Sequence, residues 1–168
     1  VDLLEKNVIA NNLKNVEVIQ KAISDKNEKV RFQISEMSGD HTMVKDNELD
    51  NIIEVDAISI DEYFKDISSS ISFVIFTIEG AELKALKGMR ETIKKSNGLT
   101  IMTEFYPEKI RSLGDSPEEF LELLTNFGFE IYNLEDGLSP IHKTDSETLI
   151  ANMNKDKQYR RDLLCKLK

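Results

Sequence analysis

Two glutamates, Glu79 and Glu104, stand near the carboxyl ends of two segments that are predicted to be neighbouring buried strands. Ligands of parallel α/β sheets bind outside the carboxyl ends of the strands. A pair of carboxylates in such a place can accept a proton from a substrate or hold a cation. Both residues are therefore candidates for catalysis.

Glu79 has a second interpretation, which the sequence leaves open. It stands directly before a predicted helix, where a carboxylate accepts hydrogen bonds from backbone N–H groups and is favoured by the helix dipole. Glu82, in the first turn of the same helix, is expected to be a partner of the dipole rather than a catalytic group.

His41 is the third candidate for acid–base chemistry, because histidine titrates near neutral pH. It lies in a polar, glycine-containing segment at 35–42 (SEMSGDHT), whose length suggests a lid or a substrate loop. The alternative interpretation is a surface histidine without a catalytic task. The chain has one cysteine, Cys165, and two histidines, so we expect neither a zinc-type ligand cluster nor another metal site.

The stretch that must position the two glutamates is residues 73–89 (FVIFTIEGAELKALKGM). Residues 73–77 favour β structure without alternating with polar residues, which indicates a strand buried on both faces. The spacing then becomes helical, and one apolar face is formed by Leu83, Leu86, Met89 and Ile93. A strand, a tight turn at Gly80 and a helix are therefore predicted.

The other segments are predicted from the same signals. Further strands are expected at 16–19, 29–34, 55–60, 99–105, 129–134 and 148–153, with a hairpin turn at Asp136-Gly137, and helices near the start of the chain, at 61–64 and after a capping box at 116–119. Asp61 is expected to cap its own short helix. The tail at 155–168, rich in basic residues, is expected to be an extension or a terminal helix. This order predicts an α/β fold with a mostly parallel sheet and an antiparallel C-terminal strand.

Length and composition restrict the function. The chain has 168 residues, enough for one domain with a core, and a formal net charge of -9, which disfavours binding to a nucleic-acid backbone. It has no apolar run long enough to span a membrane, so we expect a cytoplasmic protein. The oligomeric state is left open.

Several segments together resemble the FkbM-type methyltransferases, which use S-adenosylmethionine. The resembling residues are Leu4-Glu5-Lys6-Asn7, Asn12-Leu13-Lys14-Asn15-Val16, Ala22-Ile23-Ser24-Asp25, Ile58-Ser59-Ile60-Asp61, Ile78-Glu79-Gly80-Ala81-Glu82, Leu86-Lys87-Gly88 and Glu104. The resemblance implies a Rossmann-like class I methyltransferase fold and methylation of a hydroxyl oxygen on a sugar or another small metabolite. It also implies that Thr77 and Ile78 line the site near the methionine part of the cofactor, and that Lys21 and Ala22 approach its adenine.

The chain departs from the family in two respects. Ile75 and Thr77 occupy the places of a Lys and an Asp in the family motif, and no glycine-rich cofactor loop is found. We therefore expect residues 1–154 to be a partial methyltransferase domain whose first two strands lie before Val1. Two rival functions stay open: a non-catalytic interaction domain or fragment, and a metal-dependent hydrolase that uses Glu79 and Glu104.

Overall fold

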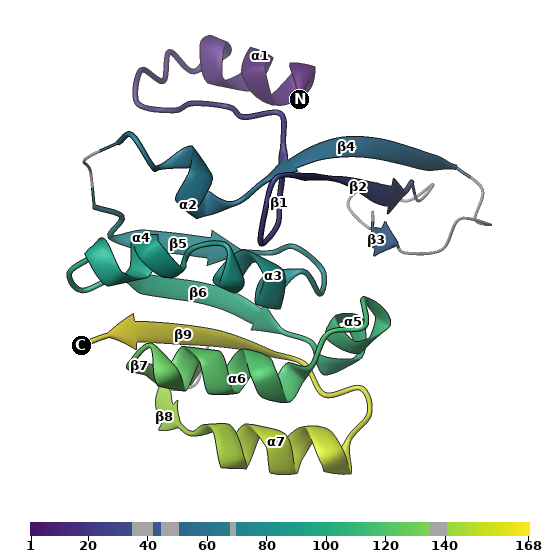
Figure 1. Ribbon diagram of the computed structural model, residues 1–168, viewed down its shortest axis with the longest axis vertical. Coiled ribbons are helices and arrows are strands. Elements are labelled where there is room, and N and C mark those ends of the chain that lie inside the picture. The colour runs from purple at the N-terminus through teal and green to yellow at the C-terminus, as the bar shows by residue number, and fades with distance from the viewer. Residues whose placement is uncertain (35–41, 45–50, 68–69, 135–140) are drawn as a thin grey trace.

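The computed structural model describes residues 1–34, 42–44, 51–67, 70–134 and 141–168. Within these residues it is a mixed α/β structure with two sheets (Figure 1). The smaller sheet has four strands in the order β1-β4-β2-β3, and the larger has five in the order β5-β6-β9-β7-β8. His41 and the expected hairpin turn at Asp136-Gly137 lie outside the described residues.

The smaller sheet is built from the first third of the chain. Its strands are β1 (Ala22–Ile23), β2 (Glu28–Gln33), β3 (Thr42–Val44) and β4 (Ile52–Ile58). β1 is parallel to β4, whereas β2 is antiparallel to both β3 and β4. The predicted strand at 29–34 is confirmed, with Val30 buried. Helix α1 (Asp2–Ala10) precedes this sheet in the chain and has no buried residue, and the short helix α2 (Ile60–Tyr63) follows β4.

The predicted strand at 16–19 is wrong. The chain enters the smaller sheet only at Ala22, and Val16 and Ile19 are exposed. A segment with β preference forms a strand only if another strand offers hydrogen-bond partners, and the described residues offer none to 16–19.

The larger sheet contains the predicted central strands. β5 (Phe73–Phe76) is parallel to β6 (Thr100–Phe105), and β9 (Arg161–Leu167) lies antiparallel between β6 and β7 (Phe129–Leu134). β8 (His142–Thr144) closes the sheet antiparallel to β7. The expected antiparallel C-terminal strand is therefore present, but at 161–167 rather than at 148–153. The expectation of a mostly parallel sheet is wrong for the described residues, because β5–β6 is parallel whereas β6–β9, β9–β7 and β7–β8 are antiparallel.

Five helices accompany the larger sheet: α3 (Glu82–Lys87), α4 (Arg90–Lys95), α5 (Pro107–Ser112), α6 (Pro117–Asn126) and α7 (Ser146–Lys155). The predicted apolar face of the central helix is confirmed, since Leu83, Leu86, Met89 and Ile93 are buried in the main core. The helix is interrupted at Gly88, so it forms α3 and α4 instead of one element. The capping box is also confirmed, because Ser116 Oγ accepts a hydrogen bond from Glu119 N at 3.1 Å.

Two C-terminal predictions are wrong. Residues 148–153 belong to α7, whose first turn is fixed by Asp145 Oδ1, an acceptor for Thr148 N at 2.7 Å. The tail expected to be a helix instead contains β9, in which Leu163 and Cys165 alternate with more exposed residues and enter the core. The proposed boundary of a partial domain at residue 154 stays a prediction.

β5 differs from the predicted fully buried strand. It is the edge of the larger sheet within the described residues, and Phe73 and Ile75 are 51% and 58% exposed. Only Phe76 of this strand is fully buried. The expected burial on both faces is therefore wrong for this chain.

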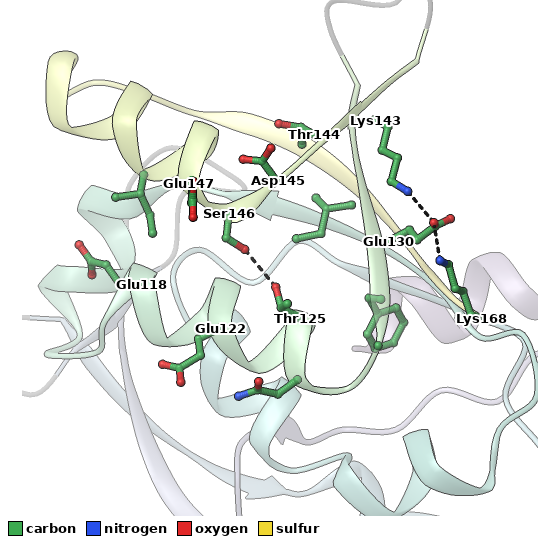
Figure 2. Close-up of a pocket in the computed structure, with 15 residues that line it drawn as sticks. Glu118, Glu122, Thr125, Glu130, Lys143, Thr144, Asp145, Ser146, Glu147 and Lys168 are labelled. Carbon is green, nitrogen blue, oxygen red and sulfur yellow. Dashed lines mark hydrogen bonds and ion pairs between the residues drawn. The ribbon is translucent and has the colours of Figure 1, made fainter.

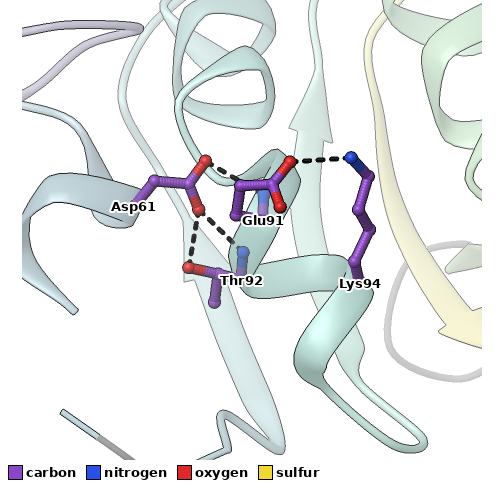
Figure 3. Close-up of polar contacts among 4 residues, drawn as sticks. All are labelled: Asp61, Glu91, Thr92 and Lys94. Carbon is purple, nitrogen blue, oxygen red and sulfur yellow. Dashed lines mark hydrogen bonds and ion pairs between the residues drawn. The ribbon is translucent and has the colours of Figure 1, made fainter. Parts of the chain in front are cut away.

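Asp61 caps a different helix from the one that we predicted. Ser59 caps α2, because its Oγ accepts a hydrogen bond from Glu62 N at 3.2 Å. Asp61 instead reaches the start of α4, where Oδ2 accepts from Glu91 N at 3.0 Å and Oδ1 accepts from Thr92 N at 2.7 Å and from Thr92 Oγ1 at 2.8 Å (Figure 3). The Asp61 carboxylate therefore joins α2 to α4, one of the helices that accompany the larger sheet.

Replacing Asp61 with alanine is expected to lower the free energy of unfolding by about 2 kcal/mol, because α4 loses its capping acceptors. Urea unfolding measures the change. The matched control is Asp66→Ala, since Asp66 is exposed and five residues away, and a surface change of this kind costs less than about 0.5 kcal/mol. Equal losses in the two variants would contradict the capping role.

Candidate functional site

The turn after β5 has an unusual backbone. Glu79 and Gly80 both adopt the left-handed region, with φ of 52° and 101°. Gly80 also packs against the first turns of α5, where a Cβ atom on Gly80 would lie 2.6 Å from the carbonyl oxygen of Lys109. Glycine is required at this position for its conformation and for the close approach. The turn therefore holds Glu79 at a defined place at the carboxyl end of β5.

Both predicted catalytic carboxylates are paired with cations. Glu79 Oε2 lies 3.8 Å from Lys109 Nζ, and Glu104 Oε1 accepts a hydrogen bond from the guanidinium of Arg160. The Glu104 side chain is 12% exposed and that of Glu79 is 30% exposed. Glu104 is therefore the more enclosed of the two carboxylates.

Arg160 connects the two glutamates electrostatically. Its pKa is raised mainly by the hydrogen bond to Glu104 and also by the negative charge of Glu79. The guanidinium carbon lies 5.7 Å from the centre of the Tyr106 ring, which is a cation–π distance. The structure thus brings Glu79 and Glu104 into one charged cluster, as the sequence predicted, although it adds cations that we had not predicted.

Glu82, in the first turn of α3, is almost completely buried and is affected by the charge of Glu104. Burial raises the pKa of its carboxyl group to about 7, and the charge of Glu104 acts in the same direction. Backbone N–H groups of Ile78, Gly80 and Glu82 itself favour the ionised form and offset part of the increase. Its environment is thus dominated by desolvation, which the expected role as a dipole partner did not include.

The four residues predicted to bind the cofactor are divided between the two sheets. Ala22 and Ile78 pack against the same smaller core cluster, formed by Val30, Met43, Ala57, Ala81 and Leu113. Lys21 borders an apolar pocket of about 330 Å³ together with Ile19, Ile23, Ile58, Ile60, Tyr63 and Phe64. Thr77 is exposed at the end of β5. The structure therefore brings Ala22 and Ile78 to one region, with Lys21 beside it.

A second, larger pocket contains none of the predicted residues. It has a volume of about 930 Å³ and lies between α6, β7, β8 and α7 (Figure 2). Carboxylates line much of it, and Glu130 in its wall is paired with both Lys143 and Lys168. Its residues are separate from the carboxyl ends of β5 and β6.

Sequence reasoning missed Lys109 and Arg160. Lys109 belongs to α5, where the sequence indicated only that Pro107 ends a strand. Arg160 precedes β9, whose alternating Leu163, Cys165 and Leu167 would have indicated a strand had the tail not been interpreted as helical.

Comparison with known protein families identifies a match for most of the chain. A family model described as the methyltransferase FkbM domain matches residues 2–131, which include the turn at Glu79 and both parallel strands β5 and β6. No curated protein and no solved structure matches the chain. None of the described helices has the length and the apolar run needed to cross a membrane.

Proposed function

The chain belongs to the family of proteins with an FkbM methyltransferase domain, and from this premise we propose that it transfers a methyl group from S-adenosylmethionine to a hydroxyl oxygen of a sugar or another small metabolite. The observation that supports this most is the left-handed turn at Glu79-Gly80, which holds Glu79 at the end of β5, next to the parallel strand β6 that carries Glu104, inside the matched segment. Cytoplasm is the compartment that we propose for it.

Glu104 is the residue that we propose as the proton acceptor. S-adenosylmethionine, when bound, supplies a methyl group that is activated by a positively charged sulfur. The protein must then align the acceptor hydroxyl and remove its proton. The Glu104 side chain is 12% exposed, so it is partly enclosed and still reachable by a substrate. Glu79 is a second acceptor in the same cluster, and His41 stays a proposal that rests on its residue type alone.

The residues on the smaller sheet fit the nucleoside end of the cofactor. The pocket beside Lys21 is walled by aliphatic and aromatic side chains and has a volume suited to a small flat ring. We propose that Lys21 and Ala22 contact the adenine and that Thr77 and Ile78 contact the methionine part.

Calorimetric titration with S-adenosylmethionine tests the cofactor assignment. The protein is expected to bind it. Absence of binding would overturn the proposal and favour a non-catalytic interaction domain. That rival is motivated by Thr77, which occupies the place of an aspartate in the family motif.

Replacing Glu104 with glutamine in the full-length protein is expected to lower kcat by roughly 10² to 10⁴-fold, the range found when a general base is removed. The affinity for S-adenosylmethionine should not change, because Glu104 is not proposed to contact it. Glu91→Gln, on the exposed surface of α4, is the control. Full kcat in Glu104→Gln would exclude this residue as the base.

A metal-dependent hydrolase is the third candidate function. It is less well supported, because each of the two carboxylates already has a cationic partner, Lys109 or Arg160. Activity that depends on a divalent metal ion and not on S-adenosylmethionine would favour it over methyl transfer.

A further inference from the structure

Arg160 lies outside the segment that matches the family model, residues 2–131. It stands directly before β9, and its guanidinium donates a hydrogen bond to Glu104 Oε1. The same guanidinium lies over the Tyr106 ring, with its carbon 5.7 Å from the ring centre. A residue from outside the matched segment thus contacts the proposed proton acceptor.

The pairing of β6 with β9 explains why these three side chains meet. The last pair of this antiparallel ladder is Phe105 opposite Arg161. The next residues along the two chains are Tyr106 and Arg160, which accounts for the contact between the ring and the guanidinium. Side chains two positions apart on a strand point to the same face of a sheet, so Glu104 shares this face with Tyr106. The strand register therefore carries the guanidinium to the face that holds the carboxylate.

The same register places a second carboxylate beside Glu104. Asp162 lies directly opposite it on β9, and like charges in such a cross-strand pair repel each other. Glu79, at the end of β5, is a third negative charge nearby. The hydrogen bond to Glu104 is the main cause that raises the pKa of Arg160, and the charges of the other two carboxylates act in the same direction. Arg160 is therefore the cation that offsets their repulsion.

The shape of the guanidinium adds a restraint that charge alone does not give. The group is planar and its N–H donors have fixed directions, so stacking on an aromatic ring also fixes the direction of the hydrogen bond that it donates. The Arg160 side chain is 55% exposed, and an ion pair with so exposed a partner contributes little to folding stability. We therefore expect this contact to matter for the orientation of Glu104 more than for stability.

We propose that Arg160 is a positioning residue for the proton acceptor: stacked on Tyr106, it holds the Glu104 carboxylate in the orientation that takes the proton of the acceptor hydroxyl. The inference rests on the proposed function, in which Glu104 accepts this proton. The proton moves from the hydroxyl oxygen to a carboxylate oxygen of Glu104 and then to water, and Arg160 keeps its own protons throughout.

Steady-state kinetics of the Arg160→Ala variant test the inference, with S-adenosylmethionine and with methyl glucoside as the hydroxyl acceptor. We expect kcat to fall roughly 10- to 100-fold, because a misplaced reacting group loses about this much rate. The dissociation constant for S-adenosylmethionine should not change. Millimolar guanidinium chloride should restore part of kcat, whereas the same concentration of ammonium chloride should not. Rescue by the planar cation alone separates orientation from neutralisation of charge.

Arg111→Gln is the matched control, because Arg111 on α5 forms the same kind of ion pair with Glu118 on α6, at 3.2 Å. Its side chain is 47% exposed, close to the value for Arg160, and the variant should keep the native kcat. Tyr106 provides a second test. Tyr106→Leu removes the ring below the guanidinium and should lower kcat as Arg160→Ala does, whereas Tyr106→Phe keeps the ring and should lose much less.

Native kcat in Arg160→Ala would overturn the inference. A loss that guanidinium does not restore, or that ammonium restores equally well, would also overturn it, since orientation would then not be the cause. If Arg160→Ala does not fold, Tyr106→Leu decides, and native kcat in that variant would count against the inference.

Side-chain ¹⁵N NMR of the arginine guanidinium groups separates this inference from the proposed function, because it needs neither cofactor nor acceptor. The N–H signals of Arg160 are expected to exchange slowly with water in the native protein and rapidly in Glu104→Ala and in Tyr106→Leu. Slow exchange in a protein that binds no S-adenosylmethionine would contradict only the proposed function. Rapid exchange in a native protein that transfers methyl groups would contradict only the role of Arg160.

Discussion

Replacing Gly88 with alanine is expected to lower the free energy of unfolding by about 3 kcal/mol or more, one of the two largest effects that we predict for a single substitution. A Cβ atom at this position would overlap the carbonyl oxygen of Ser24 and would lie 3.1 Å from both Asp25 Cα and Ser59 Cβ. These atoms belong to the backbone or lie next to it, so they cannot move aside as the end of a long side chain could.

The location of Gly88 explains why the loss should be global. Its carbonyl oxygen accepts a hydrogen bond from Asp61 N at 2.8 Å, and its Cα faces the end of β1. Gly88 is therefore the point where the end of β1 and the start of α2 contact the α3–α4 segment, which accompanies the larger sheet. An added methyl group would push these two parts of the molecule apart.

Urea unfolding of the Gly88→Ala variant measures this loss, and Gly98→Ala is the matched control. Gly98 has a left-handed φ of 70°, and no atom lies within 4 Å of the position that a Cβ atom would take there, whereas Gly88 has an ordinary helical φ of -80°. Gly98→Ala therefore adds only backbone strain, about 1 to 2 kcal/mol. If the two variants lost the same free energy, the close approach at Gly88 would not be the reason for glycine there.

Elements with strong local signals could be predicted from the sequence. The change from β preference to helical spacing at Gly80, and the Ser116-Pro117 start of α6, specify their structures through a few neighbouring residues. Each of these signals agrees with the burial of the same side chains in the main core, for example Leu83 and Phe120. Local preference and tertiary packing therefore point to the same structure.

The wrong predictions concern segments whose structure depends on distant partners. Residues 16–19 have β preference, but no strand lies beside them among the described residues. Residues 148–153 contain β-branched side chains, yet they form a helix because Asp145 caps its first turn. β9 forms because β6 and β7 offer it two hydrogen-bonding edges. These partners are about 30 to 60 residues away in sequence, beyond the reach of spacing arguments.

The candidate site follows the same division. The position of Glu79 and Glu104 could be predicted, since both stand at strand ends that the sequence identifies. Their partners Lys109 and Arg160 could not, because an ion pair depends on how α5 and β9 return to the sheet. The burial of Glu82 was missed for another reason: position in the first helical turn says where its charge is favoured, but not how much water surrounds it.

Glu82→Gln is expected to gain stability relative to the native protein as the pH rises. The difference in the free energy of unfolding, variant minus native, should be about 3 kcal/mol larger at pH 8 than at pH 4. The pKa of Glu82 is raised from 4.5 to about 7 in the folded protein, mainly by burial. Between these values the folded state binds more protons than the unfolded state. The stabilising contribution of this group is therefore fully present below pH 4.5 and is lost as the pH rises through 7.

Glutamine has nearly the same shape but no charge, so the variant should lack this pH-dependent term. Denaturant unfolding of both proteins at pH 4, 6 and 8 gives the difference at each pH, and subtracting the two curves removes the contributions of other carboxyl groups. Glu79→Gln is the control, because its side chain is 30% exposed and no comparable desolvation acts on it. If the difference in unfolding free energy between the native protein and Glu82→Gln stayed constant from pH 4 to pH 8, folding would not raise the pKa of Glu82. The N–H groups of the Ile78–Gly80 turn would then have to compensate for the burial of its charge.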